Sequence, residues 1–94
     1  MVFDISKVTG IANFSEKPEK ERTLYLKDEK VFLVVNKNTI ELRTDGKLAK
    51  LLSEKYESVM DSRYFGRGGI EIVLSSQLSE DELYDLVRLS YNLS

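Results

Sequence analysis

The middle of the chain carries the side chains whose types and spacing best suit ligand binding. Residues 37–67 hold seven Lys or Arg and five Asp or Glu, whereas residues 68–94 hold one base and five acids. The basic side chains include Lys37, Arg43, Lys47, Lys50, Arg63 and Arg67. Gathered on one surface, they could bind nucleic acid, because Lys and Arg displace the counterions of its phosphates. The alternative is a solvated face, since acids are interleaved with these bases along the chain.

A glycine-rich segment, Tyr64-Phe65-Gly66-Arg67-Gly68-Gly69, is a second candidate for binding. Aromatic rings can stack on bases, and an arginine among glycines can approach phosphate or guanine closely. The segment is no phosphate-binding loop of the dinucleotide or Walker type, because it precedes a predicted strand rather than a helix. Alternatively, the glycines supply positive φ for a turn and the aromatic rings cover the edge of the core. Both observations together predict a nucleic-acid site made of Lys47, Lys50, Arg63, Tyr64 and Arg67.

Catalytic and metal chemistry have little support in the residue types. The chain has no His and no Cys, which removes imidazole bases, thiol nucleophiles and most zinc or haem ligands. Some acids near the C-terminus could hold a hard cation, namely Glu80, Asp81, Glu82 and Asp85. Helix capping explains these acids better, because Ser79 and Glu82 form a capping-box pattern. We therefore expect no metal, no cofactor and no enzymatic activity, since the remaining side chains form no recognisable catalytic arrangement.

Length and composition are those of one globular domain spanning residues 1–94. The chain has 41% apolar and 32% charged residues, and its formal net charge of −2 is not that of a polycation. No apolar run reaches the roughly 18 residues of a membrane span. The N-terminus also lacks the basic segment and apolar core of a signal peptide. We therefore expect a cytoplasmic protein with no membrane partner.

Three short segments rich in β-branched and aromatic residues predict an antiparallel meander. They are Arg22–Lys27, Lys30–Asn36 and Thr39–Arg43. Two-residue turns at 28–29 and 37–38 set the register. They pair Leu24 with Leu33, Leu26 with Val31, Val35 with Ile40 and Leu33 with Leu42. This register places one apolar set on the core face, namely Leu24, Leu26, Val31, Leu33, Val35, Ile40 and Leu42.

The opposite face of the meander is mixed rather than polar. In this register it carries Thr23, Tyr25, Phe32, Val34, Thr39 and Glu41. Contiguous apolar surface usually marks a contact, so Tyr25, Phe32 and Val34 predict an interaction face for a homodimer or another protein. Alternatively, this face is covered by N-terminal apolar side chains that fold back, namely Phe3, Ile5 and Val8.

A helix and a fourth strand follow the meander. Asp45 can cap a helix near residues 46–58. The apolar stripe of this helix recurs at three- and four-residue steps, as Leu48, Leu51, Leu52, Tyr56 and Val59. Ile70, Ile72 and Leu74 alternate with other residues and predict a strand over 69–74.

The C-terminal segment has the best local pattern in the chain. Ser79 and Glu82 form a capping box, and Leu78 with Leu83 forms a hydrophobic staple around it, so we expect a helix near 80–92. Its inward residues are Leu83, Leu86, Val87, Ser90 and Tyr91. By contrast, residues 1–21 fit neither the helical nor the strand period. Residues 15–21, with the only proline among alternating charges, predict an exposed connector.

The order of these parts resembles the MmcQ/YjbR-like family over roughly residues 21–94. The resemblance is carried by Lys30-Val31-Phe32-Leu33-Val34-Val35, Ile40-Glu41-Leu42-Arg43-Thr44-Asp45, Leu48-Ala49-Lys50-Leu51-Leu52, Tyr64-Phe65-Gly66-Arg67-Gly68-Gly69-Ile70 and Ser90-Tyr91-Asn92-Leu93. The related TfoX N-terminal domain is similar over 24–35 but fits the glycine-rich turn less well. Members of the family normally begin with a longer N-terminal helix, so we expect that element to be short, altered or absent here.

The predicted fold is α+β, with a four-stranded antiparallel sheet over residues 22–43 and 69–74 packed by two helices. The resemblance implies a fold of this kind, which is compared with frataxin-like and double-wing DNA-binding folds. DNA binding is proposed for the family on the strength of its fold, which is an argument by analogy. We expect a small binding domain that contacts DNA or RNA. The alternative is a protein-interaction module or homodimer.

Overall fold

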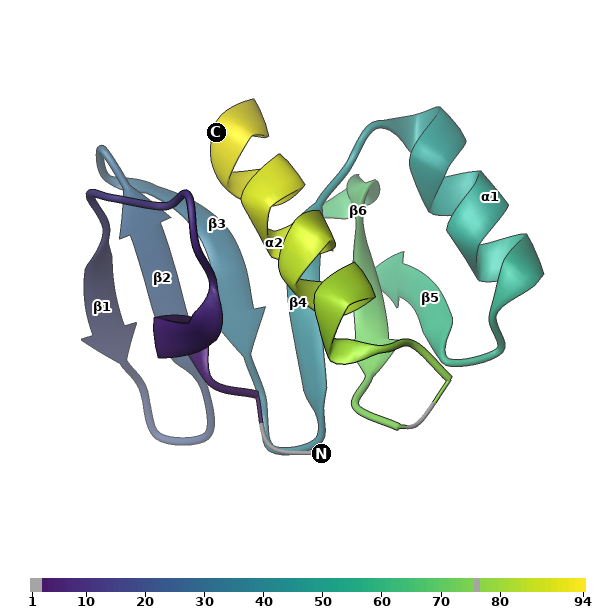
Figure 1. Cartoon of the computed structure of the whole chain (residues 1–94), viewed down its shortest axis with the longest axis horizontal. Coiled ribbons are helices and arrows are strands. Elements are labelled where there is room, and N and C mark those ends of the chain that lie inside the picture. Colours follow the sequence, from purple (N-terminus) through teal and green to yellow (C-terminus); the bar gives the residue numbers. More distant parts are fainter. Residues whose placement is uncertain (1–2, 76) are drawn as a thin grey trace.

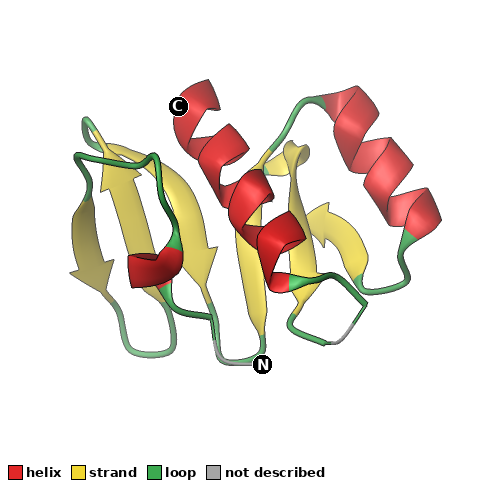
Figure 2. Cartoon of the chain, in the orientation of Figure 1, coloured by secondary structure: helices red, strands yellow, loops and turns green. Residues whose placement is uncertain are grey.

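A six-stranded antiparallel sheet with two helices on one face forms the body of the molecule, as Figures 1 and 2 show for the computed structural model. The structure describes residues 3–75 and 77–94. The strands are β1 (Ser15–Pro18), β2 (Thr23–Lys27), β3 (Lys30–Val35), β4 (Thr39–Arg43), β5 (Val59–Ser62) and β6 (Gly66–Val73). The helices are η1 (Ile5–Lys7, a 3-10 turn), α1 (Gly46–Lys55) and α2 (Glu80–Leu93).

The strands follow the order β1-β2-β3-β4-β6-β5 across the sheet. Helix α2 packs on β3 and β4, and α1 packs on β5 and β6. Both helices lie on the same face in Figure 1, and the N-terminal segment extends this layer over the β1 side. None of the helices formed by residues 3–75 and 77–94 lies on the other face of the sheet, and we call it the helix-free face. Neither α1 nor α2, in the part of the chain that the structure describes, is long and apolar enough to cross a membrane.

The prediction of four strands is wrong, because β1 and β5 also join the sheet. The proline and alternating charges of residues 15–21 predicted a connector there. In the structure every side chain of β1 is exposed, so this strand has no alternation of burial that a sequence pattern could indicate. Val59 was expected on the stripe of the first helix, but that helix ends at Lys55 and Val59 instead pairs with Ile72 of β6. In both places the pairing partner, rather than the local pattern, decides the conformation.

The other elements are confirmed, and so are their caps. The Asp45 side chain accepts a hydrogen bond from the backbone N–H of Leu48 at 2.7 Å, which ends the strand and starts α1. Ser79 and Glu82 form both halves of the capping box at the start of α2. The first predicted turn also forms, with positive φ at Asp28 and Glu29. This left-handed pair matches the twist of the hairpin without the usual Asn-Gly sequence.

A β-bulge at Phe32 changes part of the predicted register. Leu26 pairs with Val31, and Leu33 pairs with Leu42, as expected. Leu24, however, pairs with Val34 instead of Leu33, because Phe32 has no partner on β2. Leu24 therefore leaves the predicted core face, together with Leu26 on the same side of β2 and its partner Val31. Phe32 and Tyr25 lie on the core side instead.

Residues of helix α2 hold the bulge in place. The Ser90 hydroxyl donates a 2.5 Å hydrogen bond to the carbonyl oxygen of Phe32 and accepts one of 2.8 Å from the backbone N–H of Arg43. The Phe32 ring packs edge-on against Tyr91, with 5.2 Å between the ring centroids. Helix α2 thus satisfies the polar groups and fills the space that the bulge creates.

The core lies between the sheet and the helix layer. Its fully buried side chains include Phe32, Leu33, Ile40, Leu42, Ile70, Ile72 and Val87. Two helix residues differ from the prediction: Leu51 is 63% exposed, and Tyr84 is buried. Phe3 packs on the Tyr84 ring, with 6.1 Å between the centroids, so the N-terminal segment extends the core. In the described residues the N-terminal segment forms only the short η1 turn and strand β1, in line with the expectation that the family's longer N-terminal helix is short, altered or absent here.

The segment after β5 folds onto the helix-free face. The backbone N–H of Tyr64 donates to the Glu41 carboxylate at 2.9 Å, which draws the segment over β4. Gly69 makes this close approach possible, because a Cβ at that position would lie 2.6 Å from Cβ of Phe65 and 2.5 Å from the carbonyl oxygen of Leu42. Gly66 has φ of +65°, as the turn into β6 requires. The positive φ expected of these glycines is thus found at Gly66, whereas Gly69 is required for a close approach of the chain instead.

Candidate functional site

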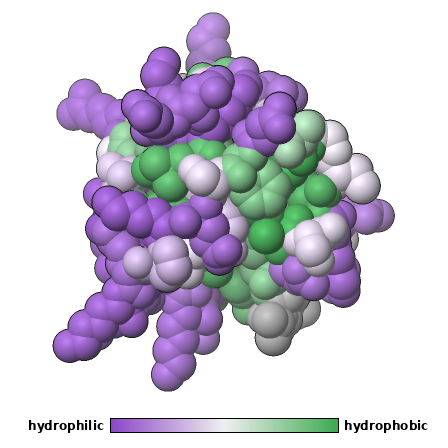
Figure 3. Space-filling view, turned by 90° about the vertical axis from the view of Figure 1, so that its left-hand side faces the viewer, coloured by the Kyte–Doolittle hydropathy of each residue, from purple (hydrophilic) through white to green (hydrophobic). Residues whose placement is uncertain are grey.

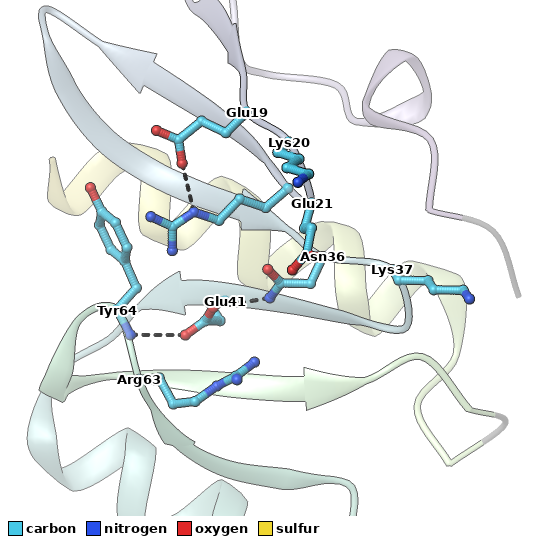
Figure 4. A pocket seen from close by; sticks show the side chains of 9 residues that line it. Glu19, Lys20, Glu21, Asn36, Lys37, Glu41, Arg63 and Tyr64 are labelled. Atoms are coloured by element: carbon cyan, nitrogen blue, oxygen red, sulfur yellow. Dashed lines mark hydrogen bonds and ion pairs between the residues drawn. The ribbon is translucent and has the colours of Figure 1, made fainter.

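An open groove of about 1160 Å³ lies on the helix-free face (Figure 4). Two hairpin turns, strand β4 and the segment after β5 form its walls and floor. The lining residues are Glu19, Lys20, Glu21 and Arg22 of the β1–β2 turn, Asn36 and Lys37 of the β3–β4 turn, Glu41 of β4, and Arg63 and Tyr64 after β5. We refer to these nine residues as the groove.

Glu41 forms the floor of the groove and is only 2% exposed. Its carboxylate accepts hydrogen bonds from Asn36 Nδ2 at 3.0 Å, Ser62 Oγ at 2.9 Å and the Tyr64 N–H at 2.9 Å. Burial by itself raises the pKa of Glu41, but the hydrogen bonds from these three donors outweigh it and hold the pKa below its ordinary value. Glu41 is therefore an ionised, saturated acceptor that anchors the Tyr64 segment.

Glu71 lies directly opposite Glu41 on β6 and is 3% exposed. Arg63 binds its carboxylate in a bidentate pair, with Nε at 2.9 Å from Oε1 and Nη2 at 2.8 Å from Oε2. Thr39 Oγ1 also donates to Oε2 at 2.8 Å and accepts from Asn36 Nδ2 at 2.9 Å. A continuous polar network therefore links the two carboxylates below the groove.

Arg22 and Tyr64 face each other across the groove. The guanidinium carbon of Arg22 lies 5.3 Å from the Tyr64 ring centroid, within the range of a cation–π contact. Arg22 is fixed by Glu19, whose Oε1 accepts from Nε at 2.7 Å. The Tyr64 ring meets the edge of Phe65, with 4.9 Å between centroids, and Tyr64 remains 40% exposed. The pair thus joins the β1–β2 turn to the segment after β5.

The groove presents both cations and acids to solvent: besides its basic side chains, Glu19 and Glu21 are exposed at the rim, and Glu19 binds Arg22. The Arg63 side chain is 76% exposed although two of its nitrogens bind Glu71. Lys20 and Lys37 at the rim are exposed, and neither is part of an ion pair among residues 3–75 and 77–94. The carboxylates of the floor are buried and satisfied. The groove can therefore bind an anion with donors that need not leave an internal partner.

The predicted nucleic-acid residues do not all lie together. Arg63 and Tyr64 line the groove. Arg67 is exposed on β6 but is not among the lining residues. Lys47 and Lys50 are exposed on α1, in the helix layer on the other side of the sheet (Figure 1).

Sequence reasoning missed Lys20, Arg22 and Glu41 as groove residues. Both lie outside the basic middle region: Lys20 is in the segment interpreted as a connector, and Arg22 begins the first predicted strand. Glu41 did carry a signal: it is a charged residue in a strand, between Ile40 and Leu42, and its predicted face is not plainly polar. A buried carboxylate needs several donors, and such clusters are often functional.

The predicted interaction face is not exposed in the structure. Phe32 and Val34 are fully buried, and the bulge places them on opposite sides of the sheet. Tyr25 is half-buried beneath Phe14, with 6.0 Å between the ring centroids. Figure 3 shows apolar surface on the β1 side of the molecule, surrounded by hydrophilic side chains. This surface differs from the predicted one, because the N-terminal segment contributes to that side.

The acids at the start of α2 do not form a metal site. Within the described ranges, no three Asp or Glu side chains lie close enough together to hold a metal ion. Glu82 belongs to the capping box and accepts a hydrogen bond from the Tyr56 hydroxyl at 2.9 Å. Its hydrogen bonds from Tyr56 and Ser79 lower the pKa of the Glu82 carboxyl. Capping and packing thus account for this acid.

The fold is that of a two-layer α+β domain with a helix-free sheet face. It is similar to the crystal structure of the Deinococcus radiodurans protein DR2400, which contains a DUF419 domain, with a TM-score of 0.81. The sequences are 15% identical, and the match covers 95% of this chain and 73% of that one. No family model and no curated protein matches the sequence. Since DUF419 is the MmcQ/YjbR-like family, the expected type of fold is confirmed.

Proposed function

We propose that this protein is a nucleic-acid-binding domain related to the MmcQ/YjbR-like family, and that it binds phosphates in the groove of the helix-free face. The observation that carries the proposal is the separation of charge in this groove. Glu41 and Glu71 are buried and saturated, whereas Lys20, Lys37 and Arg63 are exposed. Of the two exposed acids at the rim, Glu19 is bound to Arg22, and Glu21 is in no ion pair among the described residues. An approaching phosphate would therefore meet three exposed cations and one unpaired acid.

The proposal moves the site from α1 to the sheet. Of the residues predicted from sequence, it keeps Arg63 and Tyr64. Lys20, Arg22 and Lys37 take the place of the helix lysines and of Arg67. Each phosphate contact of this kind adds affinity that falls with salt, because counterions are released on binding.

Binding rather than catalysis fits the chemistry of the groove. A general base must reach its substrate and needs a pKa near the working pH. Glu41 is buried, already accepts three hydrogen bonds, and has a pKa below its ordinary value. The Glu71 carboxylate cannot act as a base either, because both of its oxygens accept hydrogen bonds from Arg63. We therefore propose no enzymatic role for either acid.

The alternative, a protein-interaction module, has less support. It was based on an exposed face formed by Tyr25, Phe32 and Val34. Two of these side chains are fully buried, so they cannot contact a partner without unfolding of the sheet.

Salt-dependent titration tests the proposed function. Labelled single-stranded and duplex oligonucleotides are titrated with the full chain at two salt concentrations. The double variant Lys20→Gln/Lys37→Gln should weaken binding. It should also reduce the magnitude of the slope of log affinity against log salt concentration by about two. The matched control is Lys47→Gln/Lys50→Gln, which removes the same charge from α1 and should leave affinity nearly unchanged.

Two results would contradict the proposal. One is the absence of binding to any oligonucleotide at low salt. The other is an equal loss of affinity in both double variants, which would indicate attraction to total charge rather than to the groove.

A further inference from the structure

We infer that the groove recognises unpaired bases, and hence single-stranded nucleic acid, by stacking a base on the Arg22–Tyr64 pair. The inference rests on the proposed function and specifies the ligand of the same site. Unpaired bases stack on aromatic rings or on the plane of an arginine guanidinium. In this groove the Arg22 guanidinium and the Tyr64 ring are already in contact.

The stacking platform is held from several sides before any ligand arrives. Glu19 binds Nε of Arg22, and the Arg22 guanidinium lies over the Tyr64 ring. Phe65 packs edge-on against that ring, at 75° between the planes, and Glu41 binds the Tyr64 N–H. The Arg22 and Tyr64 side chains are therefore already ordered before a base binds. Little conformational entropy is therefore lost on binding.

Enough of the platform is exposed to accept a base. The Arg22 side chain is 41% exposed and Tyr64 is 40% exposed. Both members of the pair therefore keep solvent-accessible surface, and a base can stack on the ring or on the guanidinium. The rim cations Lys20 and Lys37 belong to the same groove and can bind the phosphates that flank the base.

Duplex nucleic acid does not suit this site. Bases in a duplex are stacked on both faces, and their edges are read by a helix or β-ribbon that enters the major groove. Both helices of this protein lie on the opposite face of the sheet (Figure 1). The site is instead a hollow of about 1160 Å³, comparable to the pockets of roughly 300–1,000 Å³ that enclose small ligands. It has room for nucleotides, and neither α1 nor α2 lies beside it to enter a major groove.

Matched oligonucleotides separate the two ligand classes. A labelled single-stranded oligothymidine and a labelled hairpin duplex with the same number of phosphates are titrated with the full chain at one low salt concentration. We expect tighter binding of the single strand. Tyr64→Leu should weaken single-strand binding by about 5-fold to 150-fold, which corresponds to ~1–3 kcal/mol of base stacking.

A charge-conserving variant isolates the role of the guanidinium. Arg22→Lys keeps the charge but removes the planar group, so single-strand affinity should fall while the salt slope stays the same. Arg67→Lys makes the same substitution outside the groove and should have no effect. Urea unfolding of each variant verifies that it is folded. If Tyr64→Leu does not fold, Arg22→Lys still tests the inference.

The outcomes distinguish this inference from the proposed function. Equal affinity for single strand and duplex, with Arg22→Lys neutral, would overturn the inference and leave nucleic-acid binding intact. Binding of neither oligonucleotide would overturn both. Displacement of the single strand by polyglutamate at equal charge concentration would also overturn the inference, because the groove would then bind anions without using bases.

Discussion

Glu41 and Glu71 are opposed residues on the neighbouring strands β4 and β6, and only Glu71 has an arginine partner. Like charges directly opposite each other destabilise a sheet, and burial of both carboxylates adds to this cost. The structure compensates with neutral donors at Glu41 and with a bidentate guanidinium at Glu71. Because the same donors position Arg63 and Tyr64, the stability of the sheet and the shape of the groove depend on one network.

Removal of the Glu41 carboxylate should destabilise the protein. Glu41→Ala removes the acceptor of the Ser62 hydroxyl and one acceptor each of Asn36 Nδ2 and the Tyr64 N–H, which keep Thr39 Oγ1 and Ser62 Oγ. Unsatisfied buried donors cost about 1–3 kcal/mol each. We expect the free energy of unfolding to fall by roughly 3 kcal/mol. Urea denaturation with an unchanged slope would measure this loss. The matched control is Asp61→Ala, an exposed acid on β5, and an equal effect of both variants would show that the network is unimportant.

Acidification should remove the contribution of Glu41 to stability. Its pKa in the folded protein lies below the ordinary value of 4.5, so the contribution is fully present above about pH 4.5 and is lost as the pH falls through the folded pKa. Glu41→Gln mimics the protonated side chain. The difference in unfolding free energy between wild type and Glu41→Gln should therefore shrink between pH 7 and pH 3. A difference that stays constant over this range would contradict the assignment.

Two leucine-to-alanine variants test the position of the core. Leu33 is fully buried between the sheet and the helix layer, so Leu33→Ala should cost roughly 2–5 kcal/mol. Leu51 is 63% exposed on α1, and Leu51→Ala should change stability by no more than about 0.5 kcal/mol. Urea unfolding curves measure both. Similar losses in the two variants would mean that the helix stripe expected from sequence is buried after all.

Adjacent glycines should respond differently to alanine. In Gly69→Ala the new Cβ meets Phe65 and the carbonyl oxygen of Leu42 at less than 3 Å, so overpacking should cost about 1–3 kcal/mol. In Gly68→Ala the new Cβ would lie 3.9 Å from the carbonyl oxygen of Thr44, an ordinary contact. Thermal unfolding should show a lower Tm only for Gly69→Ala, by about 4–8 °C for each kcal/mol. Equal melting temperatures would show that Phe65 moves away freely.

Two residues of the candidate site, Arg63 and Tyr64, could be predicted from sequence. Arg63 and Tyr64 stood out because an aromatic residue and bases adjoin a glycine-rich turn. Arg22 could not be paired with Tyr64, because the contact forms only when the segment after β5 folds back over the sheet. Lys47 and Lys50 were close to these residues in sequence but lie in the other layer.

The sequence by itself determined the elements whose signals are local. Alternating apolar residues defined β2, β3, β4 and β6, and side-chain caps at Asp45 and Ser79 defined where the two helices begin. These features depend on hydrogen bonds and side-chain periods within a few residues. A pattern along the chain is sufficient to reveal them.

Only the tertiary structure decided the edge strands and the two faces of the sheet. Strand β1 has no buried side chain and is a strand because β2 pairs with it. The bulge at Phe32, which moves Leu24 to the helix-free face, is held by Ser90, 58 residues away in the sequence. One unpaired residue shifts every following side chain to the other face of a strand. The faces therefore depend on a long-range contact that no local period can indicate.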